Sequence, residues 1–157
     1  MSLGSIVLTA RLAELGTVLP PVARPVADYV PAVRMRDLVY TSGQLPMKDG
    51  ELAARGILGG EVSVEEGAEL ARLCTLNALA AIAGVVDLDA VRRVVKLTGF
   101  VASAPGFTQQ SAVINGASGL IRDLFGSAGD HTRSAIGVAA LPLGAPVEVE
   151  LIVEIDG

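Results

Sequence analysis

Hydrophobic side chains recur at helical spacing in two stretches of the chain. Between residues 64 and 83 the apolar positions repeat every three or four residues, and Ser63-Val64-Glu65-Glu66 has the pattern of a capping box. A second helix is predicted to open at Phe107-Thr108 and to end at Gly126, because glycine is common just beyond a helix end. The pattern therefore predicts two helices, each with one apolar face.

The remaining apolar residues follow the shorter period of β-strands. Two short strands joined by a polar turn at 34–37 are predicted within residues 29–43. Longer strands are predicted at 91–101, 134–140 and 147–155. This order of strands and helices predicts an α+β fold in which two helices cover one face of a mixed sheet.

Residues 1–28 differ from the rest of the chain. Residues 11–16 favour one or two helical turns, and the prolines at 20, 21 and 25 then impose an extended path. We interpret residues 1–28 as an N-terminal appendage and residues 29–157 as a single domain, which agrees with a length of 157 residues.

The composition suggests self-association. Apolar residues make up 51% of the chain, aromatic residues only 3%, and the mean hydropathy is +0.55. A surplus of small aliphatic side chains is expected where subunits cover part of each other's apolar surface. An alanine-rich composition also raises mean hydropathy without any interface, so an oligomer is one of two interpretations.

The charged residues and the single cysteine exclude several classes of function. The net charge is −5 and the basic residues form no run, so nucleic acid is not expected as a partner. The chain has no apolar window long enough for a membrane span and no secretory signal, which indicates a cytoplasmic protein. With only Cys74 and one histidine, we expect no internal disulfide, no metal site and no other cofactor. Cys74 lies on an apolar helix face and is interpreted as an inert core thiol.

Arg133 is the first candidate for chemistry. It stands at the head of a predicted strand and shares a face with Ala135, Gly137 and Ala139, whose small side chains leave space for a ligand. A guanidinium binds a carboxylate through two parallel hydrogen bonds, so this face is suited to a small carboxylic acid. A surface arginine at a strand start is the alternative interpretation.

Glu148 is the second candidate. It shares one face of the last strand with Glu150 and Glu154, and those two fit a strand whose outer face is in water. Glu148 directly follows the turn, so it could approach whatever Arg133 holds and direct a water molecule onto it. His131 stands in a polar loop, and we expect no role for it.

Residues 29–155 resemble the YjgF/RidA family of imine deaminases. The matching pieces occur in the family's order: Tyr29-Val30, then Ser42-Gly43-Gln44-Leu45-Pro46, an alanine-rich helix at 77–79, a second helix containing Asn115, then Arg133-Ser134 and a Leu-Pro turn. The sequence departs from well-known deaminases at position 135, where many carry Cys, and at position 137, where many carry Glu. Its stretch from 107 to 115 is also longer.

The resemblance implies a chorismate-mutase-like fold assembled as a homotrimer with clefts between subunits. It implies that Arg133 holds the carboxylate of a 2-imino acid and that Glu148 positions the attacking water. Tyr29, Gly43, Asn115 and the backbone of Ala135 would line the pocket. Three hypotheses remain open: a deaminase of 2-imino or enamino acids, a trimer that binds a small carboxylate without turnover, and a ribonuclease, which the acidic composition disfavours.

Overall fold

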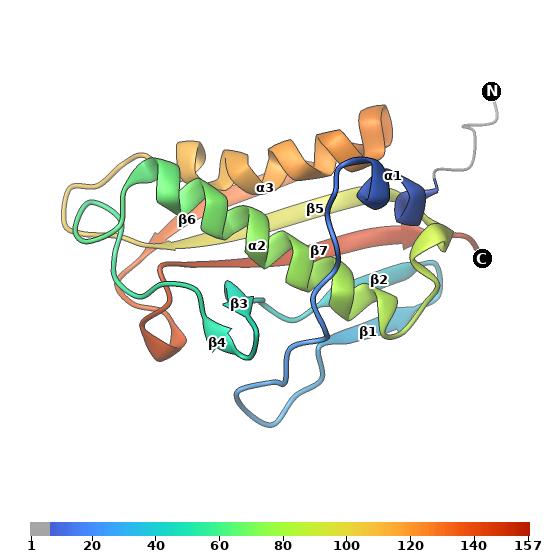
Figure 1. Ribbon diagram of the computed structural model, residues 1–157, viewed down its shortest axis with the longest axis horizontal. Helices are drawn as coiled ribbons and strands as arrows, with labels where there is room; N and C mark the ends of the chain where they lie inside the picture. Colours follow the sequence, from blue (N-terminus) through green and yellow to red (C-terminus); the bar gives the residue numbers. More distant parts are fainter. Residues whose placement is uncertain (1–6) are drawn as a thin grey trace.

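A five-stranded sheet is the centre of the fold in the computed structural model, which describes residues 7–157 (Figure 1). The strand order is β1-β2-β7-β5-β6. The bounds are Ala32–Met35 for β1, Leu38–Thr41 for β2, Val91–Ala102 for β5, Thr132–Val138 for β6 and Val147–Ile155 for β7. Because β5 and β6 are parallel and the other neighbours are antiparallel, the sheet is mixed, as predicted.

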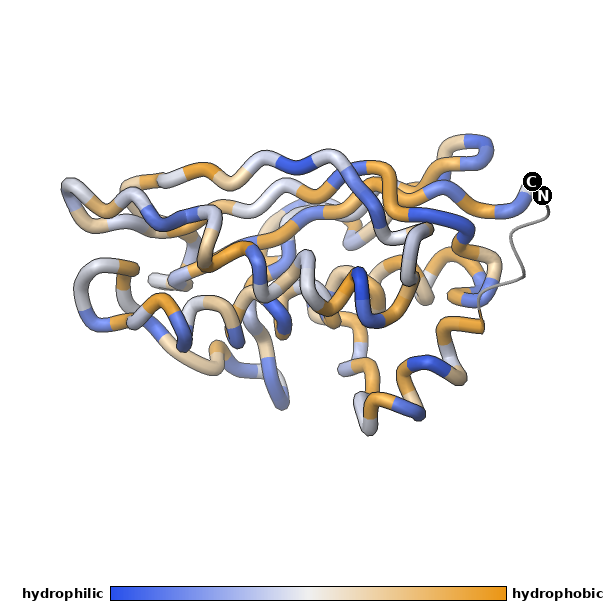
Figure 2. Tube along the Cα trace, turned by 90° about the horizontal axis from the view of Figure 1, so that it is seen from above, coloured by the Kyte–Doolittle hydropathy of each residue, from blue (hydrophilic) through white to orange (hydrophobic). Residues whose placement is uncertain are grey.

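Two long helices cover one face of this sheet. They are α2, Val64–Ala83, and α3, Gln110–Phe125, and they lie side by side over β5 and β7 (Figure 1). In a view turned by 90°, the strands form one layer and the helices the other (Figure 2). The sheet face away from α2 and α3 carries no helix from residues 7–157. The α+β architecture predicted from the order of elements is therefore confirmed.

Strand β7 shows why the sequence pattern places the core on one side of the sheet. Its odd-numbered residues, from Val147 to Ile155, are at most 3% exposed and face the helices. Its even-numbered residues are half-buried on the sheet face away from α2 and α3, which we call the open face. Burial of apolar side chains is the main favourable contribution to folding, at roughly 25 cal/mol per Å². The alternation thus fixes which face of β7 meets α2 and α3.

The two helices approach each other closely at Gly116. A side chain at this position would collide with the backbone of Ala68 on α2. The absence of a Cβ therefore lets the helix backbones come together, in a core built from small aliphatic residues.

Helix boundaries follow from local hydrogen bonds. α2 begins as predicted, because the Ser63 hydroxyl accepts a hydrogen bond from the Glu66 backbone N–H at 3.1 Å. α3 begins at Gln110, so the predicted start at Phe107-Thr108 is wrong. There the Gln110 side-chain amide donates to the Phe107 carbonyl at 2.9 Å and holds the preceding turn outside the helix.

The strand predicted at 134–140 occupies Thr132–Val138 instead. Its pairing with β5 begins at Lys96 opposite Thr132 and stops where β5 ends, at Ala102 opposite Val138. Ala139 therefore lies beyond the strand, and only Ala135 and Gly137 follow Arg133 on its face.

The short elements connect these layers. They are the hairpin of β3, Met47–Lys48, and β4, Glu51–Leu52, and the 3₁₀ turns Leu88–Ala90, Gly126–Gly129 and Pro142–Gly144. The predicted turn at Lys48-Asp49-Gly50 joins β3 to β4, with positive φ at Asp49 and Gly50.

The segment interpreted as an appendage contributes to the core. Its helix α1 spans Leu8–Glu14, somewhat earlier than predicted, and buries Leu8 and Leu12 with the main hydrophobic cluster. The Thr9 hydroxyl donates to the Asp89 carboxylate at 2.8 Å and ties α1 to the turn before β5. Residues 1–6 lie outside the described part of the chain.

Candidate functional site

Arg133 lies on β6 and is held by α3. It pairs with the fully buried Leu97 in register, so its side chain points to the helix-covered face at the edge of the sheet. Its guanidinium donates to the Asn115 side-chain oxygen at 2.8 Å, to the Ser118 hydroxyl at 3.2 Å and to the Ser111 carbonyl at 3.4 Å. These three acceptors share one face of α3, so they fix the direction of the guanidinium.

The positive charge of Arg133 has no carboxylate partner among residues 7–157. The three ion pairs in this part of the chain involve other arginines. A guanidinium has five N–H donors, and three are used here by neutral acceptors, so two remain for a further anion. This differs from a surface arginine that is merely solvated, because the side chain is half-buried and its orientation is fixed.

An open pocket of about 470 Å³ lies beside this guanidinium. Its walls come from α3 and from the turn that precedes β6. The lining residues are Asn115, Ser118, Arg122, Gly129, Asp130, His131 and Arg133. We call Arg133, Asn115 and Ser118 the arginine half-site.

The small residues along β6 do not form the floor expected from the sequence. A side chain at Gly137 would meet the Gln110 amide, so Gln110 fills that space. Ala135 packs against the hydrophobic core and is not among the residues that line the pocket beside Arg133. The available space therefore lies toward Ser118 and His131 rather than along the strand.

Glu148 lies on the opposite face of the sheet. It pairs with Phe100, three residues along β5 from the partner of Arg133, and an odd separation places the two side chains on different faces. Its carboxylate sits directly above Gly43, where any side chain would collide with it. Gly43 is held in place because the next residue, Gln44, exchanges backbone hydrogen bonds with Val149.

Burial raises the pKa of Glu148, and the nearby negative charge of Glu150 raises it further. Glu148 forms no ion pair among residues 7–157. A partly desolvated carboxylate without a cation holds a proton more readily than a surface carboxylate, which is the property that a general base requires.

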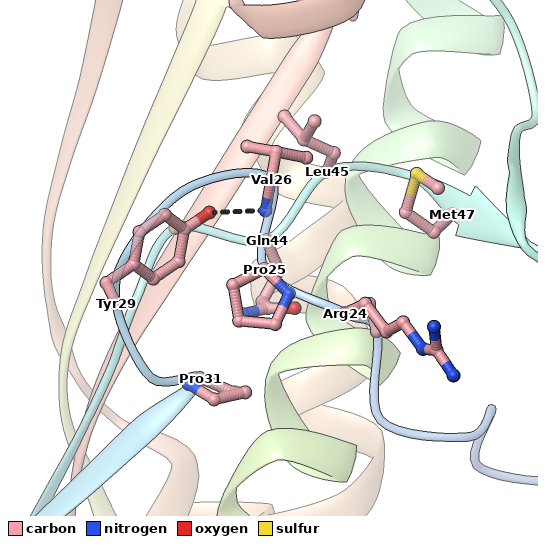
Figure 3. Close-up of a pocket in the computed structure, with 10 residues that line it drawn as sticks. Arg24, Pro25, Val26, Tyr29, Pro31, Gln44, Leu45 and Met47 are labelled. Atoms are coloured by element: carbon pink, nitrogen blue, oxygen red, sulfur yellow. Dashed lines mark hydrogen bonds between the residues drawn. The ribbon is translucent and has the colours of Figure 1, made fainter.

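Tyr29 lies on the same side of the fold as Gly43. The two residues line a small pocket of about 30 Å³ with Pro25, Val26 and neighbouring residues of the N-terminal segment. Figure 3 shows the Tyr29 hydroxyl directed at the backbone nitrogen of Val26, whose N–H donates to it at 3.4 Å. We call Glu148, Gly43 and Tyr29 the glutamate half-site.

The structure thus brings together two groups of the predicted residues but not all of them. Arg133 and Asn115 meet in the arginine half-site. In the glutamate half-site, Gly43 lies against the Glu148 carboxylate and lines a small pocket together with Tyr29. Within one protomer Arg133 and Glu148 lie on opposite faces of the sheet. The expectation that Glu148 approaches the ligand of Arg133 is therefore not met inside a single chain.

His131, for which the sequence predicts no role, is a neighbour of Arg133. It is half-buried, and its ring contacts Ser118 and the Gly129 carbonyl. The only local signal is its position two residues before Arg133, which places both side chains at the same edge of the sheet.

Other features of the chain do not suggest a second chemistry. Cys74 is fully buried in the core, and burial raises the pKa of its thiol well above the usual range, which disfavours the reactive thiolate. No cluster of His, Cys, Asp or Glu among residues 7–157 has the size of a metal site. Within the same residues, no helix combines the length and the apolar character that crossing a membrane requires.

Residues 21–155 match the family model described as Endoribonuclease L-PSP. The chain belongs to this family, which is the YjgF/RidA family, as the resemblance predicted.

Relatives cover nearly the whole chain. Protein TCP17 from Trypanosoma cruzi is 46% identical over 151 residues, which is 95% of this chain and 94% of that protein. The crystal structure of Atu1372 from Agrobacterium tumefaciens, a protein of unknown function, is 47% identical, has a TM-score of 0.87 and covers 98% of this chain and 96% of its own. The structure of E. coli TdcF with bound serine is 28% identical and has a TM-score of 0.62; the match covers 85% of this chain and 93% of that protein.

Proposed function

We propose that this protein hydrolyses 2-imino acids, or their enamine tautomers, to 2-keto acids and ammonia. The observation that carries the proposal is the Arg133 guanidinium, which is oriented by neutral acceptors and retains two N–H donors beside an open pocket. A carboxylate accepts two parallel hydrogen bonds from such a group, and this pairing is shorter and stronger than one between neutral groups.

The chemistry requires few groups. Glu148 takes a proton from water while the water oxygen attacks the C=N carbon, and it returns this proton to the imine nitrogen, which gives a carbinolamine. Glu148 then takes the proton of the carbinolamine hydroxyl group and passes it to the amino nitrogen. Collapse of the carbinolamine breaks the C–N bond, and the nitrogen leaves as ammonia with the bonding electron pair: R–C(=NH)–COO⁻ + H₂O → R–CO–COO⁻ + NH₃. Positioning of the imine and of the water, with modest acid–base help, is sufficient for an intermediate of this reactivity.

The two half-sites act together only if a second copy of the chain supplies one of them. The open sheet face presents exposed apolar side chains from three strands, including Val33 at 53%, Tyr40 at 42% and Ile136 at 42% exposure. A face of this kind supports self-association. We propose a homotrimer of chorismate-mutase-like architecture in which the arginine half-site of one protomer faces the glutamate half-site of its neighbour, with Asn115, Tyr29, Gly43 and the Ala135 backbone near the ligand.

A second candidate is a trimer that binds a small carboxylate without turnover. It is favoured by the structure of the relative TdcF, which holds serine, an amino acid that carries both a carboxylate and an α-nitrogen. The family model's description as an endoribonuclease suggests a third activity, but a net charge of −5 does not favour binding to RNA. A cytoplasmic location and the absence of any cofactor stay predictions.

The test compares Arg133→Ala with the unchanged protein. An amino-acid oxidase generates the imine, and release of keto acid and ammonia is followed against the spontaneous rate. We expect kcat/KM to fall about 10- to 100-fold, because a hydrogen-bonded charge pair with the substrate is lost. Arg11→Ala is the matched control, since Arg11 lies on α1 and contacts Glu14 and the Asp123 carbonyl instead. Equal rates for Arg133→Ala and the unchanged protein would refute the proposal.

A further inference from the structure

A chain of hydrogen bonds links His131 to the Arg133 guanidinium. The His131 Nδ1 atom lies 2.5 Å from the Gly129 carbonyl oxygen, and its Nε2 atom lies 2.9 Å from the Ser118 hydroxyl. Ser118 in turn lies 3.2 Å from an Arg133 Nη1 donor. All four residues line the pocket beside the guanidinium.

The direction of every hydrogen bond in this series follows from the groups at its two ends, the Gly129 carbonyl and the Arg133 guanidinium. A carbonyl oxygen only accepts, so the proton of the neutral His131 ring must be on Nδ1, which leaves Nε2 as an acceptor. The Ser118 hydroxyl therefore donates to Nε2. A guanidinium only donates, so the Ser118 oxygen accepts from Arg133. Donors and acceptors match at each contact, and no alternative direction satisfies both ends with a neutral ring.

Without His131, the Ser118 hydroxyl would be free to rotate about its Cβ–Oγ bond. Its proton could then point toward Arg133 and remove one of the three acceptors that orient the guanidinium. With His131 present, the Ser118 hydroxyl donates its proton to the ring Nε2, and the oxygen lone pairs face Arg133. The ring is itself fixed, because it is half-buried and bonded to the backbone at Gly129.

We propose that His131 is a positioning residue for the anion-binding arginine and acts through Ser118. It keeps the Ser118 oxygen as an acceptor for Arg133, so that the two remaining guanidinium donors stay directed at the carboxylate of a ligand. The inference rests on the proposed function only in that Arg133 binds a carboxylate, and it holds equally for an enzyme and for a binding protein.

Two substitutions of His131 separate this role from a merely structural one. In His131→Gln the amide reaches the place of Nε2 and offers Ser118 an acceptor again. In His131→Asn the amide reaches only the place of Nδ1, so the bond to Gly129 can form but the bond to Ser118 cannot. The probe is 2-oxobutyrate, and its dissociation constant is measured by calorimetry on the intact full-length protein.

We expect His131→Asn to weaken binding of 2-oxobutyrate about 3- to 10-fold, as the loss of one neutral hydrogen bond predicts, and His131→Gln to bind within about twofold of the unchanged protein. Ser118→Ala should weaken binding to a similar degree. Because His131 acts through Ser118, adding His131→Asn to Ser118→Ala should cause no further loss. Melting temperatures of all variants show that each one folds.

Nuclear magnetic resonance gives a second readout that does not depend on binding. His131 is the only histidine in the chain, so the imidazole nitrogen signals belong to it alone. We expect the neutral ring to carry its proton on Nδ1 and its signals to shift in Ser118→Ala.

The outcomes are distinguishable. The inference would be overturned if His131→Asn bound 2-oxobutyrate as well as the unchanged protein does, or if His131→Asn and His131→Gln lost affinity equally. It would also be overturned if the losses in the double variant were additive, or if the ring carried its proton on Nε2. Each of these results would leave Arg133 as the anchor. Binding that is equally strong in Arg133→Ala, or no binding by the unchanged protein, would overturn both this inference and the proposed function.

Discussion

At the scale of single residues, the site depends on two side chains with opposite electrostatic surroundings. Arg133 keeps its charge among neutral acceptors, whereas Glu148 is desolvated and lies near a second carboxylate. Each arrangement is unfavourable for stability and useful for function, because an unpaired charge is available to a ligand and a desolvated carboxylate is a better base. Arg133 and Glu148 are therefore both expected to lower the stability of the folded protein.

Replacing Glu148 by Gln tests this trade between stability and function. The folded-state pKa of Glu148 is raised, so folding disfavours its ionised form, and stability falls as pH rises from the ordinary value through the raised one. Glu148→Gln should therefore melt at a higher temperature than the unchanged protein at pH 7, and the difference should vanish below pH of about 4.

The same variant should lose deaminase activity, because an amide cannot accept the proton of water. In the unchanged protein, the rate should fall on acidification at a pH above that expected for an ordinary carboxyl group. Glu69→Gln, at an exposed position on α2, controls for the general effect of the substitution. A Glu148→Gln protein that is less stable at pH 7 would contradict the stated origin of the pKa shift.

At the scale of elements, α3 is the part that both builds the core and presents the acceptors for Arg133. Its apolar side chains pack on β5 and α2, while Ser111, Asn115 and Ser118 face the edge strand β6. The distance between α3 and the rest of the fold therefore also sets the geometry of the arginine half-site.

Two glycines on α3 allow a matched test of this packing. Gly116→Ala should destabilise the protein by about 1–3 kcal/mol, because the new methyl group would collide with the Ala68 backbone. Gly119→Ala should instead stabilise it by up to about 1 kcal/mol, since nothing lies within 4 Å of the new methyl group and alanine favours the helix. Chemical denaturation of both variants measures the two free energies. If the free energy of unfolding changed in the same direction in both variants, the close approach of α2 and α3 at Gly116 would not constrain the fold.

Local patterns in the sequence were sufficient to predict most elements. The alternation along 147–155 and the capping box at Ser63 each correspond to a real strand and a real helix start, because both signals depend only on neighbouring residues. The start of α3 was missed because it depends on a side-chain contact of Gln110 with the preceding turn.

The relation between the site residues could not be predicted in the same way. Whether Arg133 and Glu148 share a face depends on the register of β6 and β7 against β5, which no local pattern reveals. His131 looked like an ordinary loop residue, because its partner Ser118 lies 13 residues away on a helix. Both facts required the tertiary structure.

At the scale of the whole molecule, the opposite placement of the two half-sites has a clear consequence. A protein that needs both Arg133 and Glu148 on one substrate must assemble so that different copies supply them. The exposed apolar residues on the open sheet face give such an assembly a surface to bury.

Subunit complementation tests this most directly. Alone, Arg133→Ala is expected to keep at most about a tenth of the activity and Glu148→Gln to be nearly inactive. The two variants are co-expressed with different affinity tags so that mixed assemblies can be purified. If the two residues come from different protomers, random mixing restores about one quarter of the sites, because each site needs one intact arginine and one intact glutamate drawn independently. We predict recovery of imine hydrolysis to about this fraction of the unchanged protein. Mixed assemblies as inactive as either variant alone would contradict a site shared between subunits.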